Sequence, residues 1–163
     1  MRIELIQPFI NSADAVLAQG LESPISIENL TMDEEAYRPK GIAAEIAVSG
    51  DIEGRIIFDV DEPTAVSLAR NLGADPASAS DLAREAVCEL ANQIIGNAIT
   101  VLNDQGFHFR VHPPQIHTSE QGSKSSEDTE AVVLCLSAAD TKLFMNVALR
   151  YSPRTRGTAT GAN

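Results

Sequence analysis

The sequence predicts an α+β fold, with helices packed on one face of an antiparallel sheet. Apolar side chains recur at helical spacing in three separate segments. The β-patterned runs form two groups, one between the first and second helical segments and one after the third, with turn residues between neighbouring runs. Because strands joined by short turns pair in opposite directions, the order α-β-β-β-α-α-β-β-β predicts hairpins rather than parallel crossover units.

The N-terminal segment, residues 3–17, has apolar positions at helical spacing and predicts the first helix. Pro8 is expected in its first turn, where a missing N–H costs little, and Gly20 is expected to end it. Residues 24–28 alternate between apolar and polar side chains and predict a short strand. The polar residues 31–40 predict a loop.

The middle of the chain predicts a hairpin and then a second helix. Two β-patterned runs, residues 41–49 and 54–60, flank the turn residues 49–54 and predict an antiparallel pair. Asp61 then stands where a helix N-cap is expected, and Gly73 stands where that helix should end.

The longest helix is predicted over residues 80–103, with Ser80 or Asp81 as its N-cap and Gly106 beyond its end. At about 100° per residue, its apolar side chains gather on one broad face. These side chains are Ala83, Val87, Leu90, Ala91, Ile94, Ala98, Val101 and Leu102.

Three further strands are predicted in the C-terminal part. Residues 107–112 form one, and residues 131–137 and 143–151 form an antiparallel pair. Between them, residues 118–130 are rich in Ser, Glu, Gln, Gly and Lys and predict a mobile loop or a wide turn. No internal repeat is evident at the level of motifs.

Length and composition indicate one soluble globular domain. The chain has 163 residues, of which 44% are hydrophobic and 21% charged, and the domain is expected at residues 1–151. Residues 152–163 have little apolar content and predict a disordered tail. No apolar run approaches the about 20 residues of a membrane span, and no signal peptide is evident, so a cytoplasmic location is expected.

The charge and the cysteines exclude several classes of function. A net charge of −11 without a basic block argues against binding to nucleic acid or to an anionic membrane. Cys88 and Cys135 lack CxxC spacing and lie in apolar surroundings, so both are expected to be buried thiols rather than a disulfide.

A polar stripe lies opposite the apolar face of the long helix. Its members are Glu85, Glu89, Asn92, Gly96, Thr100 and Asn103. Glu89 and Asn92 are three residues apart and are therefore surface neighbours, with Gly96 one turn beyond Asn92. A helical glycine costs roughly 1 kcal/mol relative to alanine, and it lets another chain approach closely. The stripe is either an ordinary solvated face or a site.

The residue types in the stripe suit one kind of chemistry. An Asn amide can position a water molecule without titrating, because it offers an acceptor and two donors. Water attack on an acyl phosphate needs alignment more than a strong base. A carboxylate one turn away can instead pair with a cationic lysine of a partner.

Residues Glu89–Ala98 resemble the E-x-x-N motif, followed by G-N-A, of the CheC/CheX family of chemotaxis phosphatases. Residues Leu5–Ile10 resemble the opening of CheX-like proteins, in which Asn usually stands at the position of Gln7. The resemblance covers about residues 1–151. It implies a CheC-like antiparallel sheet and a phosphatase of a phosphorylated CheY-like response regulator.

The resemblance also implies roles for the stripe. Asn92 would orient the attacking water at the receiver's phosphoaspartate, and Glu89 would contact the receiver's active-site lysine. By its residue type rather than by the resemblance, Gly96 would leave room for the partner. Glu85 stands where the broader family pattern often has Asp or Ser, and as a partner-binding candidate it would add negative charge near the site. Mg²⁺ would belong to the receiver, with no cofactor on this chain. CheX-like proteins are typically dimers joined through their sheets.

The motif count separates two branches of the family. The N-terminal helix, with Asn11 and Asp14, shows no second E-x-x-N copy, which favours the one-site CheX arrangement over the two-site CheC arrangement.

Two alternatives stay open. The first is a zinc site at His108, His112 and His117, which lie close in sequence; a strand end and a loop do not ensure that they converge, so ordinary strand-edge histidines are favoured. The second is a binding or adaptor module of the same fold in a chemotaxis or flagellar-switch assembly. The pairing of Glu89 with Asn92 favours the phosphatase, because an adaptor needs no water-positioning amide.

Overall fold

The computed structural model describes most of the chain, namely residues 3–21, 25–33, 39–117, 131–138 and 141–153. The predicted loop at 118–130 and residues 154–163 of the predicted tail lie outside the described residues.

The described elements follow the predicted order, with one short strand added. They are α1 Ile3–Leu21, β1 Ser26–Asp33, β2 Ile42–Gly50, β3 Ile52–Val60, α2 Glu62–Asn71, α3 Ala83–Asp104, β4 Phe109–Val111, β5 Gln115–His117, β6 Ala131–Ala138 and β7 Thr141–Tyr151. The predicted α+β class is confirmed.

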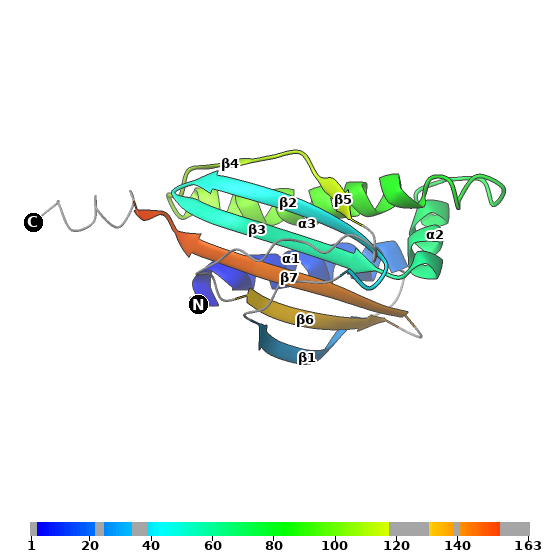
Figure 1. Cartoon of the computed structure of the whole chain (residues 1–163), viewed down its shortest axis with the longest axis horizontal. Helices are drawn as coiled ribbons and strands as arrows, with labels where there is room; N and C mark the ends of the chain where they lie inside the picture. Colours follow the sequence, from blue (N-terminus) through cyan, green and yellow to red (C-terminus); the bar gives the residue numbers. More distant parts are fainter. Residues whose placement is uncertain (1–2, 22–24, 34–38, 118–130, 139–140, 154–163) are drawn as a thin grey trace, which may run out of the picture.

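The strands form one antiparallel sheet in the order β1-β6-β7-β3-β2-β4. The short strand β5 also pairs with β2, at residues 43–45, whereas β4 pairs with β2 at residues 48–50. Helices α1 and α3 run in opposite directions and pack closely on each other and on this sheet, while α2 packs against both at one end (Figure 1). The long helix predicted to carry the polar stripe is therefore an outer layer over the sheet.

The core lies between the helices and one face of the sheet. Alternate side chains of the four central strands, β2, β3, β6 and β7, point into it, as expected for strands with one covered face. Phe9 of α1 and Phe58 of β3 are fully buried there. The buried hydroxyl of Ser12 donates to the backbone oxygen of Ile94 at 2.6 Å, which ties α1 to α3. Val87, Ile94 and Leu102 of α3 are fully buried as well. Each fully buried large side chain contributes about 1.5–3 kcal/mol, so α3 is firmly held.

The sheet has an internal symmetry that no motif revealed. The series helix-strand-strand-strand occurs as α1-β1-β2-β3 and again as α3-β4-β6-β7, with the short strand β5 added between β4 and β6. If β1 is exchanged with β4, β2 with β6 and β3 with β7, the strand order reads the same from the opposite edge of the sheet. Residues 4–17 and 89–102, aligned without gaps, are identical at six of 14 positions. The two helices are therefore related elements of a duplicated fold.

The first hairpin is tighter than predicted. Only Asp51 separates β2 from β3, and Gly54 lies within β3 rather than in the turn. Gly54 has φ +139°, and a Cβ there would collide with the backbone oxygen of Ala148 in β7. Only glycine permits this approach of the two central strands.

Several strand boundaries differ from the prediction. β1 extends through Asp33, so residues 31–33 of the predicted loop are strand residues. The strand predicted at 107–112 is shorter, covering Phe109–Val111. Chain pairing resumes at Gln115–His117 after Pro113 and Pro114, because proline cannot donate to the ladder and β2 is long enough to pair with both pieces.

The helix ends were partly predicted. Asp61 caps α2 as expected, since its Oδ1 accepts from the backbone N–H of Thr64 at 2.8 Å. Gly73, at φ +99°, follows the end of that helix. In α1, Pro8 lies in the second turn rather than the first, and the helix continues past Gly20 to Leu21.

The predicted caps of α3 are wrong. The helix begins at Ala83, and Leu82 precedes it without a side-chain cap, so neither Ser80 nor Asp81 has that role. The backbone of the preceding turns enters the helix directly: the N–H of Leu82 donates to Ser78 O, and that of Ala86 to Leu82 O. A carbonyl of the turn thus pairs the N–H of the cap residue Leu82, whose own carbonyl accepts the first α-helical hydrogen bond.

Candidate functional site

The polar stripe of α3 is exposed along its whole length, as predicted. Its six members are Glu85, Glu89, Asn92, Gly96, Thr100 and Asn103. The opposite side of the helix is buried, including Val87, Leu90 and Ile94. Val101, predicted on the apolar face, is instead 44% exposed. The stripe therefore stands on a helix whose other side is anchored in the core.

Glu89 presents its carboxylate at the surface. Its Oε1 accepts one long hydrogen bond, 3.4 Å, from Nε2 of Gln93 on the next turn. An exposed hydrogen bond of this length holds the carboxylate weakly. Glu89 is thus available to a cation from another molecule.

Asn92 is exposed one turn further along the same helix. Within the part of the chain that the structure describes, no side-chain hydrogen bond engages its amide. The amide can therefore offer two donors and an acceptor to water or to a partner.

Gly96 leaves open surface beside Asn92. A Cβ built on Gly96 meets nothing within 4 Å, so the fold itself would accept alanine there. The hydroxyl of the neighbouring Thr100 donates to the backbone oxygen of Gly96 at 3.0 Å and is turned back onto the helix. A glycine that packing does not require, and that weakens the helix by about 1 kcal/mol, favours close approach by another chain.

A groove separates the end of α2 from the start of α3, and we call it the acidic groove. Its volume is about 380 Å³. It is lined by Ala69, Leu72, Gly73, Ala74, Leu82, Glu85, Ala86 and Glu89. Apart from Gly73, its uncharged lining residues are aliphatic, and its two charged residues are both carboxylates, one of which belongs to the E-x-x-N motif.

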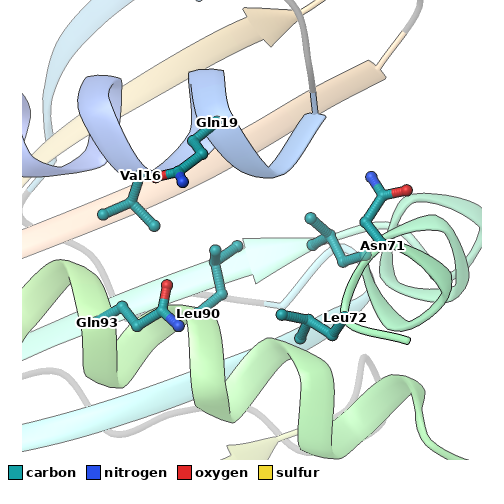
Figure 2. A pocket seen from close by; sticks show the side chains of 7 residues that line it. Val16, Gln19, Asn71, Leu72, Leu90 and Gln93 are labelled. Carbon is teal, nitrogen blue, oxygen red and sulfur yellow. The ribbon is translucent and has the colours of Figure 1, made fainter. Parts of the chain in front are cut away.

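A second hollow, which we call the amide pocket, lies between α1, α2 and α3 (Figure 2). Its volume is about 660 Å³. It is lined by Val16, Gln19, Leu68, Asn71, Leu72, Leu90 and Gln93, all of them uncharged. Leu72 lines both hollows and therefore stands between them.

Comparison with known proteins identifies the family. The sequence profile described as chemotaxis phosphatase CheX matches residues 42–137. The chain belongs to the CheX family. CheX of Borrelia burgdorferi, solved in a complex with CheY, BeF₃ and Mg²⁺, is 30% identical, with a TM-score of 0.67, over 91% of this chain and 99% of that chain.

Other solved structures share the fold. A CheC-like superfamily protein from Shewanella sp. PV-4 is 18% identical, with a TM-score of 0.79, over 92% of this chain and 99% of that one. FliY of Thermotoga maritima is 15% identical, with a TM-score of 0.58, over 86% and 84% of the two chains. No curated protein sequence matches the chain. The predicted resemblance to the CheX branch is confirmed, and the CheX match includes the whole of α3.

The two cysteines of this CheX-family chain differ from the prediction in one respect. Cys135 is buried as expected, but Cys88 on α3 is only half-buried, and neither forms a disulfide. Burial raises the pKa of the Cys88 thiol, and the negative charge of Glu85 raises it further. The thiol is therefore protonated at neutral pH and is a poor nucleophile.

Two of the three histidines contact different residues, and the third is exposed. Nε2 of His112 is 3.0 Å from Oγ of Ser49, and Nε2 of His117 is 3.1 Å from a carboxylate oxygen of Glu45. His108 is exposed. Among the described residues, no group of three or more His, Cys, Asp or Glu side chains is placed to hold a metal ion.

No described helix is long and apolar enough to cross a membrane.

Proposed function

We propose that this CheX-family protein is a phosphatase that stimulates hydrolysis of the aspartyl phosphate of a CheY-like response regulator in chemotaxis signalling. One observation carries the proposal. Glu89 and Asn92 are exposed one turn apart on a firmly packed helix, beside a glycine that leaves open space. This arrangement suits a site that docks onto another protein rather than one that encloses a small substrate.

Asn92 is proposed to position the attacking water. Its amide can accept a hydrogen bond from the water and hold an oxygen lone pair toward phosphorus, in line with the departing aspartate. The amide does not titrate, so it acts by alignment rather than by removing a proton. Because α3 is anchored in the core, the amide needs little reordering when the partner arrives.

Glu89 is proposed to fix the partner's position. A carboxylate would repel a phosphoryl group, but it pairs well with the lysine of a receiver active site. Glu85 adds a second negative charge one turn earlier. The proposal assigns Mg²⁺ to the receiver and no cofactor to this chain; the Borrelia complex, which contains CheY, BeF₃ and Mg²⁺, supports a receiver partner.

The same proposal includes a cytoplasmic homodimer. The resemblance to CheX-like proteins implies association of two copies through their sheets. The functional domain is proposed at residues 1–151, which contain the family match at residues 42–137. Both copies would then keep α3 at the outer surface, because the helices cover only one face of the sheet. Sedimentation of the purified chain tests this directly, and a strict monomer would contradict it.

The second candidate is a non-catalytic adaptor in a chemotaxis or flagellar-switch assembly. The fold similarity to FliY of Thermotoga maritima favours it, since folds host more than one function. The adaptor would bind a receiver without shortening the lifetime of its phosphoryl group.

The deciding experiment is release of phosphate from a phosphorylated CheY-like receiver with and without this protein. We expect the wild-type chain to accelerate the loss. Asn92→Ala should abolish the acceleration while largely preserving binding, and Glu89→Ala should weaken both. Binding of the receiver with no acceleration by the wild type would support the adaptor instead.

A further inference from the structure

We infer that the acidic groove is a second contact for the receiver and seats an apolar side chain that neighbours the receiver's active-site lysine. The inference deepens the proposed function and rests on it. It makes Leu72 and Leu82 specificity-determining residues, and it assigns Glu85 to the recognition of positive charge around that apolar side chain.

The exposure of the two leucines is the first argument. Leu72 is 53% exposed at the end of α2, and Leu82 is 40% exposed just before α3. A single exposed aliphatic side chain is ordinary, but these two come from different elements and line one hollow. Covering them would remove apolar surface from water, which favours association with an apolar group.

Continuity with the proposed site is the second argument. Glu89 lines the groove and is also the acidic member of the E-x-x-N motif. A partner that places a lysine on Glu89 therefore places its adjoining surface over Leu72 and Leu82. The occupant is thus a part of the same receiver and not a separate ligand.

Charge supplies the third argument. The charged residues that line the groove are Glu85 and Glu89, so the groove attracts a positively charged surface. An apolar side chain flanked by basic residues matches both the aliphatic side chains and the carboxylates of the groove. An apolar side chain flanked by acidic residues would match the aliphatic side chains but be repelled by the carboxylates.

The amide pocket offers the contrasting case. It shares Leu72 with the acidic groove, but its polar groups are the neutral amides of Gln19, Asn71 and Gln93, and it contains no carboxylate (Figure 2). It therefore provides no preference for the basic surface around a lysine. Leu82 lines only the acidic groove and Gln19 only the amide pocket, so these two residues distinguish the hollows.

The test measures single-turnover loss of phosphate from the receiver at increasing concentrations of the full-length protein. Each variant then gives a maximal rate and a half-saturating concentration. Leu82→Ala and Leu72→Ala should each raise the half-saturating concentration by about 5-fold, the effect of losing roughly 1 kcal/mol of apolar contact, and leave the maximal rate unchanged. Leu82→Met, which keeps an apolar side chain of similar size, should leave the half-saturating concentration close to that of the wild type.

Two matched controls accompany these variants. Val101→Ala removes a similarly exposed aliphatic side chain from α3, far along the helix from the groove. Gln19→Ala opens the amide pocket alone. Both variants should have the half-saturating concentration and the maximal rate of the wild type. Glu85→Gln should raise the half-saturating concentration at low salt and have little effect at high salt, because exposed charges are screened.

The outcomes separate the inference from the proposed function. If the wild type accelerates phosphate loss but Leu82→Ala behaves like Val101→Ala, the groove contact is wrong and the phosphatase stands. A rise for Gln19→Ala in place of Leu82→Ala would move the partner over the amide pocket and overturn the inference. Failure of the wild type to accelerate the reaction rejects the phosphatase itself, whatever the groove variants do.

Discussion

Helices α1 and α3 are related by the duplicated fold, yet they present different surfaces. At aligned positions, α1 has Glu4 and Gln7 where α3 has Glu89 and Asn92. Both pairs are a carboxylate and an amide three residues apart and exposed. The third position differs most, because Asn11 of α1 stands where α3 has Gly96.

The polar groups of α1 are engaged within the chain. Glu4 accepts a hydrogen bond from the hydroxyl of Tyr151 at 3.0 Å. Gln7 donates to Oδ1 of Asn11 at 2.8 Å. Asn11, which aligns with Gly96, therefore engages the side-chain amide of Gln7, which aligns with Asn92. In α3, among the described residues, the carboxylate of Glu89 accepts only the long hydrogen bond from Gln93. Gly96, which has no side chain, lies one turn beyond Asn92.

If α3 carries the proposed site and α1 does not, the carboxylate-amide spacing alone is not sufficient for a site. A site also requires that the two groups are uncommitted and that the neighbouring surface is empty. The predictions below break or sharpen this difference between the helices, from the largest expected effect to the smallest.

The largest effect is expected for Asn92→Ala. Loss of the water-positioning amide should slow receiver dephosphorylation by about 100-fold, the scale seen when one preorganised hydrogen-bonding group is removed from an active site. Single-turnover phosphate release measures the rate, and fluorescence anisotropy with a BeF₃-loaded receiver measures binding. The matched control Gln7→Ala on α1 should leave both unchanged. Equal losses for the two variants would remove the distinction between the helices.

Glu89→Ala is expected to have the next largest effect. Without the carboxylate, the receiver should bind about 10-fold more weakly, equivalent to about 1.4 kcal/mol, and the rate at subsaturating concentration should fall in proportion. Titration of the receiver at two salt concentrations checks the electrostatic origin, because the wild-type advantage should shrink at high salt. Glu4→Ala is the control and should not change receiver affinity.

Gly96→Asn places the α1 residue on α3. The new side chain has space within the chain, so the protein should fold, but it can bond Asn92 and obstruct the approaching receiver. We expect about a 10-fold loss of phosphatase rate, comparable to losing about 1.4 kcal/mol of alignment.

Gly96→Ala is the steric companion to that variant. It cannot hydrogen-bond Asn92, and it should raise the free energy of unfolding by about 1 kcal/mol, because alanine is the better helix former. Chemical denaturation measures the stability. A more stable protein with lower activity would show that the glycine serves the partner, whereas full activity in both variants would contradict the open-surface argument.

The difference between the helices also marks what sequence reasoning could reach. Periodicity predicted the helices, most strands and the exposed stripe with Glu89 and Asn92, because burial on one face imposes those periods. It missed the exposure of Val101 and the resumed strand at Gln115–His117, which depend on neighbours distant in sequence. The acidic groove was also beyond its reach, since Leu72 and Leu82 line it only once α2 has packed against α3.

The smallest effect is expected for the reciprocal change on α1. The double variant Gln7→Asn and Asn11→Gly gives α1 the amide and the glycine of α3, and it should add no measurable phosphatase activity when combined with Asn92→Ala. Glu4 would still accept the hydrogen bond from Tyr151, which holds the carboxylate away from a partner's lysine. Adding Tyr151→Phe removes that donor and should allow the first detectable activity on this face. The assay is the same single-turnover phosphate release, read against Asn92→Ala alone. Activity in the double variant without Tyr151→Phe would mean that the amide and the open glycine suffice, and that the commitment of Glu4 does not separate the two helices.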